Sequence, residues 1–157
     1  YTFDDMPPGQ RDPALTRFSI EPERANRLPV VRRALAINPA LKVMASPWSA
    51  PAWMKTTDKL IKGTLRPDAY EAFAEYLARY VDAYAAESIP IFALTIQNEP
   101  HFEPGDYPGM RLEPPARHGH RSEAARADGV GAEYPSDAVD RGLVAQARGP
   151  RDRLGFG

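Results

Sequence analysis

The sequence predicts an α/β fold whose strands form a parallel sheet. Two short apolar runs, 41–45 and 89–96, have the length and composition of buried strands. A helical pattern with one apolar face precedes each run, over about 28–38 and about 67–87. Helices that alternate with strands are typical of βα units, in which a right-handed crossover joins neighbouring parallel strands.

Both predicted strands end at a segment that contains proline. The first run, 41–45, is followed by Ser46-Pro47, and the second run, 89–96, by Gln97-Asn98-Glu99-Pro100. The second run hardly alternates between apolar and polar residues, which predicts a strand covered on both faces. Proline lacks the N–H that a strand interior needs, so it suits the point where strand pairing stops.

The two predicted helices have recognisable ends. The first is expected to begin near Leu28 and Pro29, because proline suits the first helical turn, and to end near Asn38. The second is expected from Pro67 to about Glu87. Its apolar side chains recur at spacings of three and four residues: Tyr70, Phe73, Leu77, Val81 and Tyr84. Such a stripe predicts a helix that packs against the sheet.

The last part of the chain departs from this pattern. Beyond residue 113, Arg, Ala and Gly dominate, and no helical or strand periodicity is sustained. We therefore expect a domain over 1–113 and an irregular or disordered tail over 114–157. Because Ala, Arg, Gly and Pro have GC-rich codons, one hypothesis is that the tail is translated out of frame. The alternative is a divergent native extension.

Composition argues against several functions. The 157 residues carry 20 Lys and Arg against 21 Asp and Glu, so no overall positive charge favours nucleic acid as a partner. The chain has no cysteine, which excludes disulfides and thiolate metal sites, and His118 and His120 lack a third ligand on a supporting element. No apolar run approaches the ~20 residues of a membrane span. We expect no cofactor and no metal.

The chemically informative residues follow the two predicted strands. Trp48 and Trp53 lie in the loop after the first strand, and Asn98 and Glu99 come directly after the second. The carboxyl ends of parallel strands share one edge of a sheet, where the active sites of such folds lie. An acid desolvated by aromatic loops can donate a proton near neutral pH, and an amide can bind a sugar hydroxyl. Taken singly, Glu99 also fits a helix cap or a surface acid, and the tryptophans fit core anchors.

In combination, the segments resemble family 30 of the glycoside hydrolases, which includes the glucosylceramidases. The resemblance rests on four segments in order: 1–5 (YTFDD), 45–56 (ASPWSAPAWMKT), 95–100 (TIQNEP) and 107–110 (YPGM). It covers about residues 1–113. It implies a fragment of a (β/α)8 TIM barrel around strands 3 and 4, and retaining hydrolysis of β-glycosidic bonds by two glutamates.

The resemblance also implies roles for individual residues. Glu99 matches the general acid/base at the end of barrel strand four, and Asn98 matches its neighbour that contacts the sugar's 2-hydroxyl. Trp48 matches an aromatic residue of the pocket for the reacting sugar, and Tyr107 a pocket-lining tyrosine. Two further residues are expected in supporting positions: Trp53 and His101.

The second catalytic glutamate, the nucleophile, lies on barrel strand seven in this family. Glu113, Glu123 and Glu133 fit no strand-end motif, so we expect no nucleophile in this chain and no activity of the chain on its own. The barrel's first two strands are expected to be missing as well.

Ala50, Ala52 and the segment 97–100 favour the glucosylceramidase-like branch of the family. The implied substrate is a β-glycoside or a glycosphingolipid, and the family suggests a secreted or periplasmic location. One alternative is another β-glycosidase of the same barrel clan, of the β-1,6-glucanase or xylanase type. The other alternative is a non-catalytic fragment that binds sugar weakly or not at all.

Overall fold

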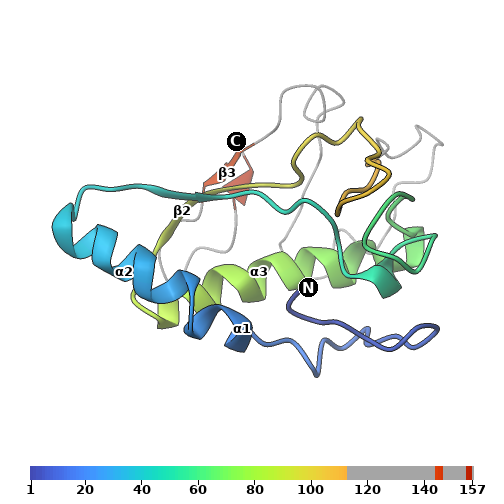
Figure 1. The fold of residues 1–157 in the computed structure, drawn as a ribbon, viewed down its shortest axis with the longest axis horizontal. Coiled ribbons are helices and arrows are strands. Elements are labelled where there is room, and N and C mark those ends of the chain that lie inside the picture. The colour runs from blue at the N-terminus through green and yellow to red at the C-terminus, as the bar shows by residue number, and fades with distance from the viewer. Residues whose placement is uncertain (113–143, 147–154, 157) are drawn as a thin grey trace.

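Figure 1 shows the computed structural model of the chain, which describes residues 1–112, 144–146 and 155–156. The helices are α1 (Glu21–Arg24), α2 (Arg27–Ile37) and α3 (Tyr70–Ala86), with single 3-10 turns η1 (Ala52–Met54) and η2 (Pro67–Ala69). The strands are β1 (Val43–Ala45), β2 (Ile91–Thr95), β3 (Val144–Gln146) and β4 (Gly155–Phe156). The predicted order of helix, strand, helix and strand is therefore present, and α1 is an element that the sequence pattern did not predict.

The sheet has the order β1-β2-β3-β4. β1 and β2 pair in parallel, with Val43 opposite Ile91 and Ala45 opposite Leu94, as the crossover through α3 predicts. β3 pairs with β2 antiparallel, and β4 pairs with β3 antiparallel. The expectation of an irregular tail over 114–157 lies largely outside the described residues. Its described residues, 144–146 and 155–156, form these two short strands.

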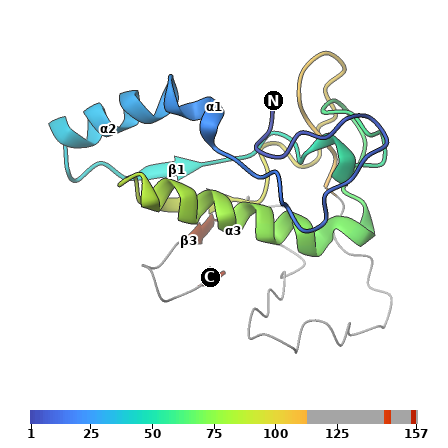
Figure 2. The ribbon, with the colours of Figure 1, turned by 90° about the horizontal axis from the view of Figure 1, so that it is seen from below.

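Helices cover one side of the first two strands. α2 and α3 both lie below β1 and β2 in Figure 1, and the view from below shows them side by side with β1 behind (Figure 2). The core between these layers consists of buried Ile20, Leu28, Tyr84, Ile89, Ile91 and Leu94. Met44 and Phe92 are exposed by 61% and 37%, respectively. The prediction of a strand covered on both faces is not met at Phe92 by the part of the chain that the structure describes, whose helices pack on one side of β1 and β2.

The end of α3 sets the entry into β2. Ser88 takes the left-handed conformation, with φ of 62°. Its N–H donates to the Ala85 carbonyl oxygen, and the N–H of Ile89 donates to that of Tyr84, both at 2.9 Å. This pair of hydrogen bonds is the Schellman motif, which satisfies the last helical carbonyls and turns the chain back along the helix.

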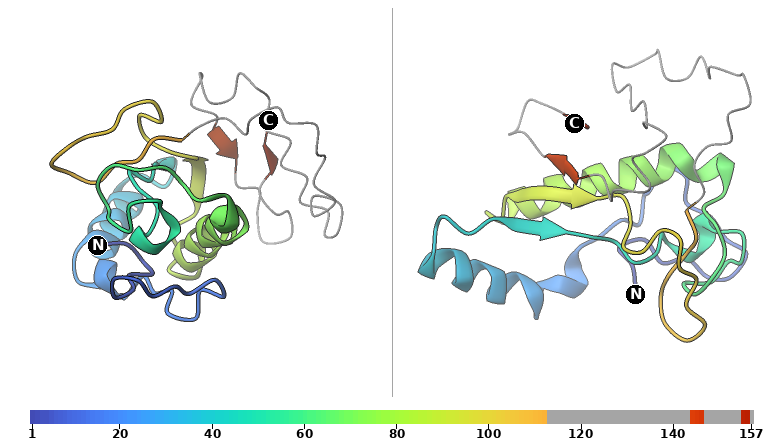
Figure 3. Two further views of the ribbon diagram at one scale, coloured as in Figure 1. Left: turned by 90° about the vertical axis from the view of Figure 1, so that its right-hand side faces the viewer. Right: turned by 90° about the horizontal axis from the view of Figure 1, so that it is seen from above.

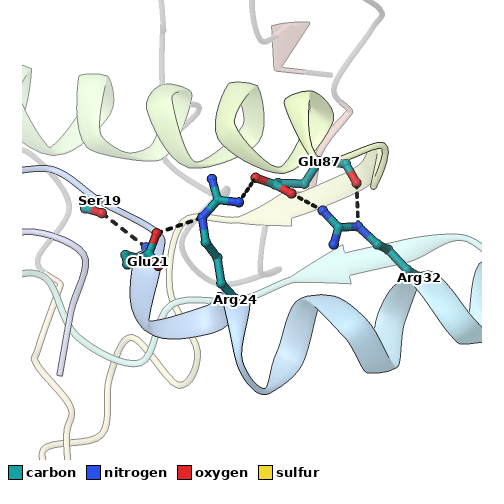
Figure 4. A network of polar contacts seen from close by, with 5 residues as sticks. All are labelled: Ser19, Glu21, Arg24, Arg32 and Glu87. Atoms are coloured by element: carbon teal, nitrogen blue, oxygen red, sulfur yellow. Dashed lines mark hydrogen bonds and ion pairs between the residues drawn. The ribbon is translucent and has the colours of Figure 1, made fainter.

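Glu87, which follows α3, connects this helix to α1 and α2 (Figure 4). One oxygen of its carboxylate lies 2.7 Å from the guanidinium of Arg24, and the other forms an ion pair with Arg32. The Nε of Arg32 donates to the Glu87 backbone carbonyl at 3.0 Å, and Arg24 also pairs with Glu21 at 2.8 Å. The Glu21 amide in turn donates to Ser19 Oγ at 3.1 Å, so the network extends to the start of α1.

The loops gather at the carboxyl ends of β1 and β2. In the right panel of Figure 3, both arrows point to the end where the loops after the strands and the N-terminal segment lie. A second core fixes this end, and its buried members come from the loops and from α3: Leu15, Ala50, Trp53, Met54, Leu65, Ala69, Phe73, Tyr76 and Met110. The loops that carry the predicted site are thus packed on the helix rather than projecting freely.

Candidate active site

Hydrogen bonds join the two strand ends. The hydroxyl groups of Ser46 and Thr95 lie 2.6 Å apart, and the N–H of Asn98 donates to the carbonyl oxygen of Pro47 at 2.8 Å. Each bond connects the residues that follow β1 with the end of β2. The loops after the two strands therefore share one edge, as parallel pairing requires.

A shallow pocket opens at this edge, with a volume of about 160 Å³ when open solvent is included. Its lining comes from the two loops: Trp48, Asn98, Glu99, Phe102, Pro104, Tyr107, Pro108 and Gly109. Four residues singled out in the sequence, Trp48, Asn98, Glu99 and Tyr107, thus lie around one hollow. The pocket combines a carboxyl group, an amide and aromatic rings, which can hydrogen-bond the hydroxyl groups of a sugar and stack on its apolar face.

Trp48 and Tyr107 form the aromatic part of the pocket. Their ring centroids lie 5.7 Å apart with an interplanar angle of 61°, an edge-to-face pair. The indole of Trp48 remains 51% exposed. A large apolar ring held by a second ring, yet open to solvent, can receive the apolar C–H face of a pyranose.

Glu99 stands at the turn that ends the second strand region. Its backbone is in the left-handed region with φ of 49°, and its carbonyl oxygen accepts a hydrogen bond from the Phe102 N–H at 2.9 Å. Residues other than glycine seldom adopt this conformation, and such strain clusters at functional sites. The Glu99 side chain is exposed. The described residues therefore do not provide the expected desolvation of this carboxyl group by aromatic loops.

Trp53 and His101 lie outside the lining of the pocket. Trp53 is 5% exposed, and its indole N–H points to Asp4, with Nε1 3.2 Å from the backbone oxygen and 3.0 Å from Oδ2. It therefore anchors the loop after β1 to the N-terminal segment. His101 is exposed on the turn after Glu99.

Asp4 is itself buried, with 1% of its surface exposed. Burial raises the pKa of Asp4 above its ordinary value, the indole of Trp53 opposes this shift, and the nearby carboxylate of Asp12 adds to it. Asp12 accepts hydrogen bonds from Thr16 Oγ1 at 2.9 Å and from the Arg17 N–H at 2.8 Å. Asp4 therefore serves the packing of the N-terminal segment against Trp53.

Three residues of this region were not singled out in the sequence. Phe102 lines the pocket with a side chain that is 52% exposed. Gln97 is buried, and its side-chain amide donates to the Met110 carbonyl oxygen, which closes the loop between them. Lys55 is buried where the two loops meet. The resemblance to the family could have indicated Gln97 and Lys55, because each belongs to a segment that carries it. Nothing in the sequence indicated Phe102.

No group of three or more His, Asp or Glu side chains within the described ranges could hold a metal ion. His118 and His120, considered as metal ligands in the sequence, lie outside those ranges. In the part of the chain that the structure describes, no helix has the length and apolar character needed to cross a membrane.

Comparison with known proteins defines the class. The profile of the glycosyl hydrolase family 30 TIM-barrel domain matches residues 1–110, and the chain belongs to this family. This confirms the resemblance and the expectation of a partial TIM-barrel domain, of which the described residues show two parallel strands and their helices.

Curated relatives divide between two activities. The chain is 34% identical to endo-1,6-β-D-glucanase neg1 of Aspergillus fumigatus over 125 residues, covering 70% of this chain and 25% of that protein. It is 35% identical to putative glucosylceramidase 3 of Caenorhabditis elegans over 105 residues, covering 64% and 20%. The chain thus spans a quarter or less of the length of these relatives.

Solved structures show the same relationship. SrfJ from Salmonella typhimurium superposes with a TM-score of 0.66 at 32% identity, covering 72% of this chain and 25% of that chain. The endo-β1,6-glucanase BT3312 superposes with a TM-score of 0.60 at 35% identity, covering 66% and 24%. The expected preference for glucosylceramidases over glucanases is not resolved, because both names occur at similar identity.

Proposed function

We propose that this chain supplies the acid/base part of a retaining β-glycosidase site, with Glu99 as general acid/base. The observation that carries the proposal is the pocket in which Glu99 meets Asn98, Trp48 and Tyr107 at the carboxyl ends of two parallel strands. In this assignment Trp48 and Tyr107 receive the reacting sugar and the Asn98 amide binds its 2-hydroxyl. Membership of family 30 supports this assignment.

The chemistry follows from the carboxyl group of Glu99. In the first step Glu99 donates its proton to the glycosidic oxygen while a second carboxylate attacks the anomeric carbon, so that the leaving group departs neutral. In the second step Glu99 removes a proton from the water that releases the sugar. The second carboxylate must lie about 5–5.5 Å from the first. We assign no residue of this chain to that role and infer that the chain alone binds the sugar without turning it over.

The proposed substrate is a β-glucoside of the glucosylceramide type. The second candidate, a β-1,6-linked glucan, is favoured by the endo-1,6-β-glucanases among the relatives. Both carry the same β-glucosyl unit and differ in the leaving group. An alkyl β-glucoside and the β-1,6-linked disaccharide of glucose therefore represent the two candidates.

Titration of the tryptophan fluorescence of the full chain, to which Trp48 and Trp53 both contribute, tests the proposal, and Trp48→Phe should abolish the response. We expect a saturable change in fluorescence with β-glucosides and none with the matching α-glucoside. The test ligand that binds more tightly, the alkyl β-glucoside or the β-1,6-linked disaccharide, indicates which of the two candidate substrates is correct. A chromogenic β-glucoside is assayed in parallel. Turnover that disappears in Glu99→Gln would contradict the inference of binding without turnover. Equal response to α- and β-glucosides would contradict the assigned site.

A further inference from the structure

Lys55 is a buried cation whose three hydrogen-bond acceptors are all uncharged. Its side chain is 1% exposed, although lysine is almost never fully buried without a charged partner. The Nζ atom donates to Ser49 Oγ at 2.8 Å, to the Leu60 carbonyl oxygen at 2.6 Å and to the Gly109 carbonyl oxygen at 2.9 Å. The three N–H groups of the ammonium thus match three acceptors.

These acceptors belong to the segments that build the pocket. Ser49 directly follows Trp48 in the chain, and Gly109 lies two residues beyond Tyr107. The Gly109 N–H also donates to the Leu60 carbonyl oxygen at 3.1 Å. Position 109 accepts no side chain in this arrangement, because a Cβ atom there would meet Cγ of Pro104 at 2.4 Å. One ammonium group therefore joins the loop that carries Trp48 to the loop that carries Tyr107.

We propose that Lys55 is a positioning residue, which holds the loops of the pocket so that Trp48 and Tyr107 keep their edge-to-face geometry for the sugar, and which does not touch the substrate. The role in sugar binding rests on the proposed function, whereas the role in holding the two rings does not. An apolar side chain of equal length would fill the same volume and leave the Ser49, Leu60 and Gly109 oxygens without their donor, which is costly in a buried site.

The charge of Lys55 adds a second consequence. Burial lowers the pKa of Lys55 to about 8, and the Glu103 carboxylate, which accepts the Gly63 N–H at 2.6 Å, opposes this shift from the loop after β2. Above this pH the neutral amine has two N–H groups for three acceptors. The lowered pKa nevertheless means that deprotonation favours the buried position of Lys55 over an exposed one, so the two loops should stay joined as the pH rises through about 8.

NMR of the full chain tests the proposal without a ligand, through the nuclear Overhauser effect between the rings of Trp48 and Tyr107. In Lys55→Met we expect this ring contact to be lost and the affinity for methyl β-glucoside to fall about tenfold. The matched control is Lys59→Met, since Lys59 is an exposed lysine of the same loop, and it leaves both unchanged. A folded Lys55→Met variant with the ring contact and the affinity intact would overturn the proposal.

Ser49→Ala covers the case in which Lys55→Met does not fold, because it removes the acceptor of Lys55 that lies next to Trp48. The contact between the rings of Trp48 and Tyr107 should weaken in this variant. A folded Ser49→Ala variant with an unchanged ring contact would overturn the proposal. If the ring contact responds as expected but no β-glucoside binds to the unmodified chain, the proposed function fails and the positioning of the rings by Lys55 stands.

Discussion

The backbone N–H of Asn98 donates a 2.8 Å hydrogen bond to the carbonyl oxygen of Pro47, two residues that are 51 positions apart in the chain. Trp48 follows Pro47 directly, and Glu99 follows Asn98 directly. This bond therefore sets the separation between the aromatic platform and the carboxyl group across the pocket. It exists because β1 and β2 are parallel and end at the same edge.

Replacement of Trp48 by alanine is expected to weaken β-glucoside binding by about tenfold or more and to leave stability nearly unchanged. The indole lines the pocket but remains 51% exposed, so its removal leaves little cavity. Isothermal titration and thermal unfolding measure the two effects separately. Tyr70→Ala is the control, because Tyr70 is an aromatic residue of α3 with 42% exposure outside the pocket lining. Equal losses of affinity in both variants would contradict the role of Trp48.

Replacement of Phe102 tests whether the leaving group of a bound glycoside contacts this side chain. It lies one turn beyond Glu99, the proposed proton donor to the leaving group, and its exposed ring lines the same pocket. Phe102→Ala should weaken phenyl β-glucoside about fivefold and leave methyl β-glucoside unchanged, because the methyl group is too small to reach the ring. Phe102→Leu keeps an apolar surface and should lose less. Identical losses of affinity for both ligands would contradict a contact between Phe102 and the leaving group.

Asp4 makes stability depend on pH. Because burial raises the folded-state pKa of Asp4, the folded protein holds this proton to a higher pH than the unfolded chain does. The free energy of unfolding therefore falls as the pH rises from the ordinary value of 3.8 through the raised pKa. Asp4→Asn should remove this part of the slope while keeping an acceptor for the Trp53 indole. Urea unfolding at several pH values measures it, and an unchanged slope in Asp4→Asn would refute the assignment.

The network around Glu87 is expected to stabilise the packing of α1 and α2 on α3. Its side chain is 13% exposed and meets both Arg24 and Arg32. Glu87→Gln should lower the free energy of unfolding by about 1 kcal/mol, and added salt should reduce the difference. Glu75→Gln is the matched control on α3, because the Glu75–Arg79 pair is more exposed, at 55% and 38%. A larger loss for Glu75→Gln than for Glu87→Gln would contradict this account.

The sequence predicted the elements whose pattern is local. Both parallel strands, α2 and α3 follow from apolar runs, helical spacing and proline positions. The short helix α1 could not be predicted in this way, because it depends on distant contacts. Its Glu23 is fully buried and accepts hydrogen bonds from Tyr1 Oη at 2.5 Å and Tyr84 Oη at 3.1 Å.

The pocket was predictable in part. Trp48, Asn98 and Glu99 each follow a strand, so parallel pairing brings them to one edge. The exposure of the Glu99 carboxyl group could not be read from the chain, because it depends on what lies above the pocket. The role of Lys55 depends on an acceptor 54 residues away, Gly109, and no local pattern indicates such a contact.

In the proposed mechanism, Glu99 donates a proton to a sugar bound against Trp48. A glucose analogue with a fused imidazole, whose nitrogen stands where the glycosidic oxygen would be, accepts that proton without any turnover. Its affinity for the full chain and for Glu99→Gln is the most direct measurement. If Glu99 donates this proton, Glu99→Gln should weaken binding of the imidazole analogue by about a hundredfold and binding of methyl β-glucoside by less than about threefold. Equal affinity of the analogue for both proteins would contradict it.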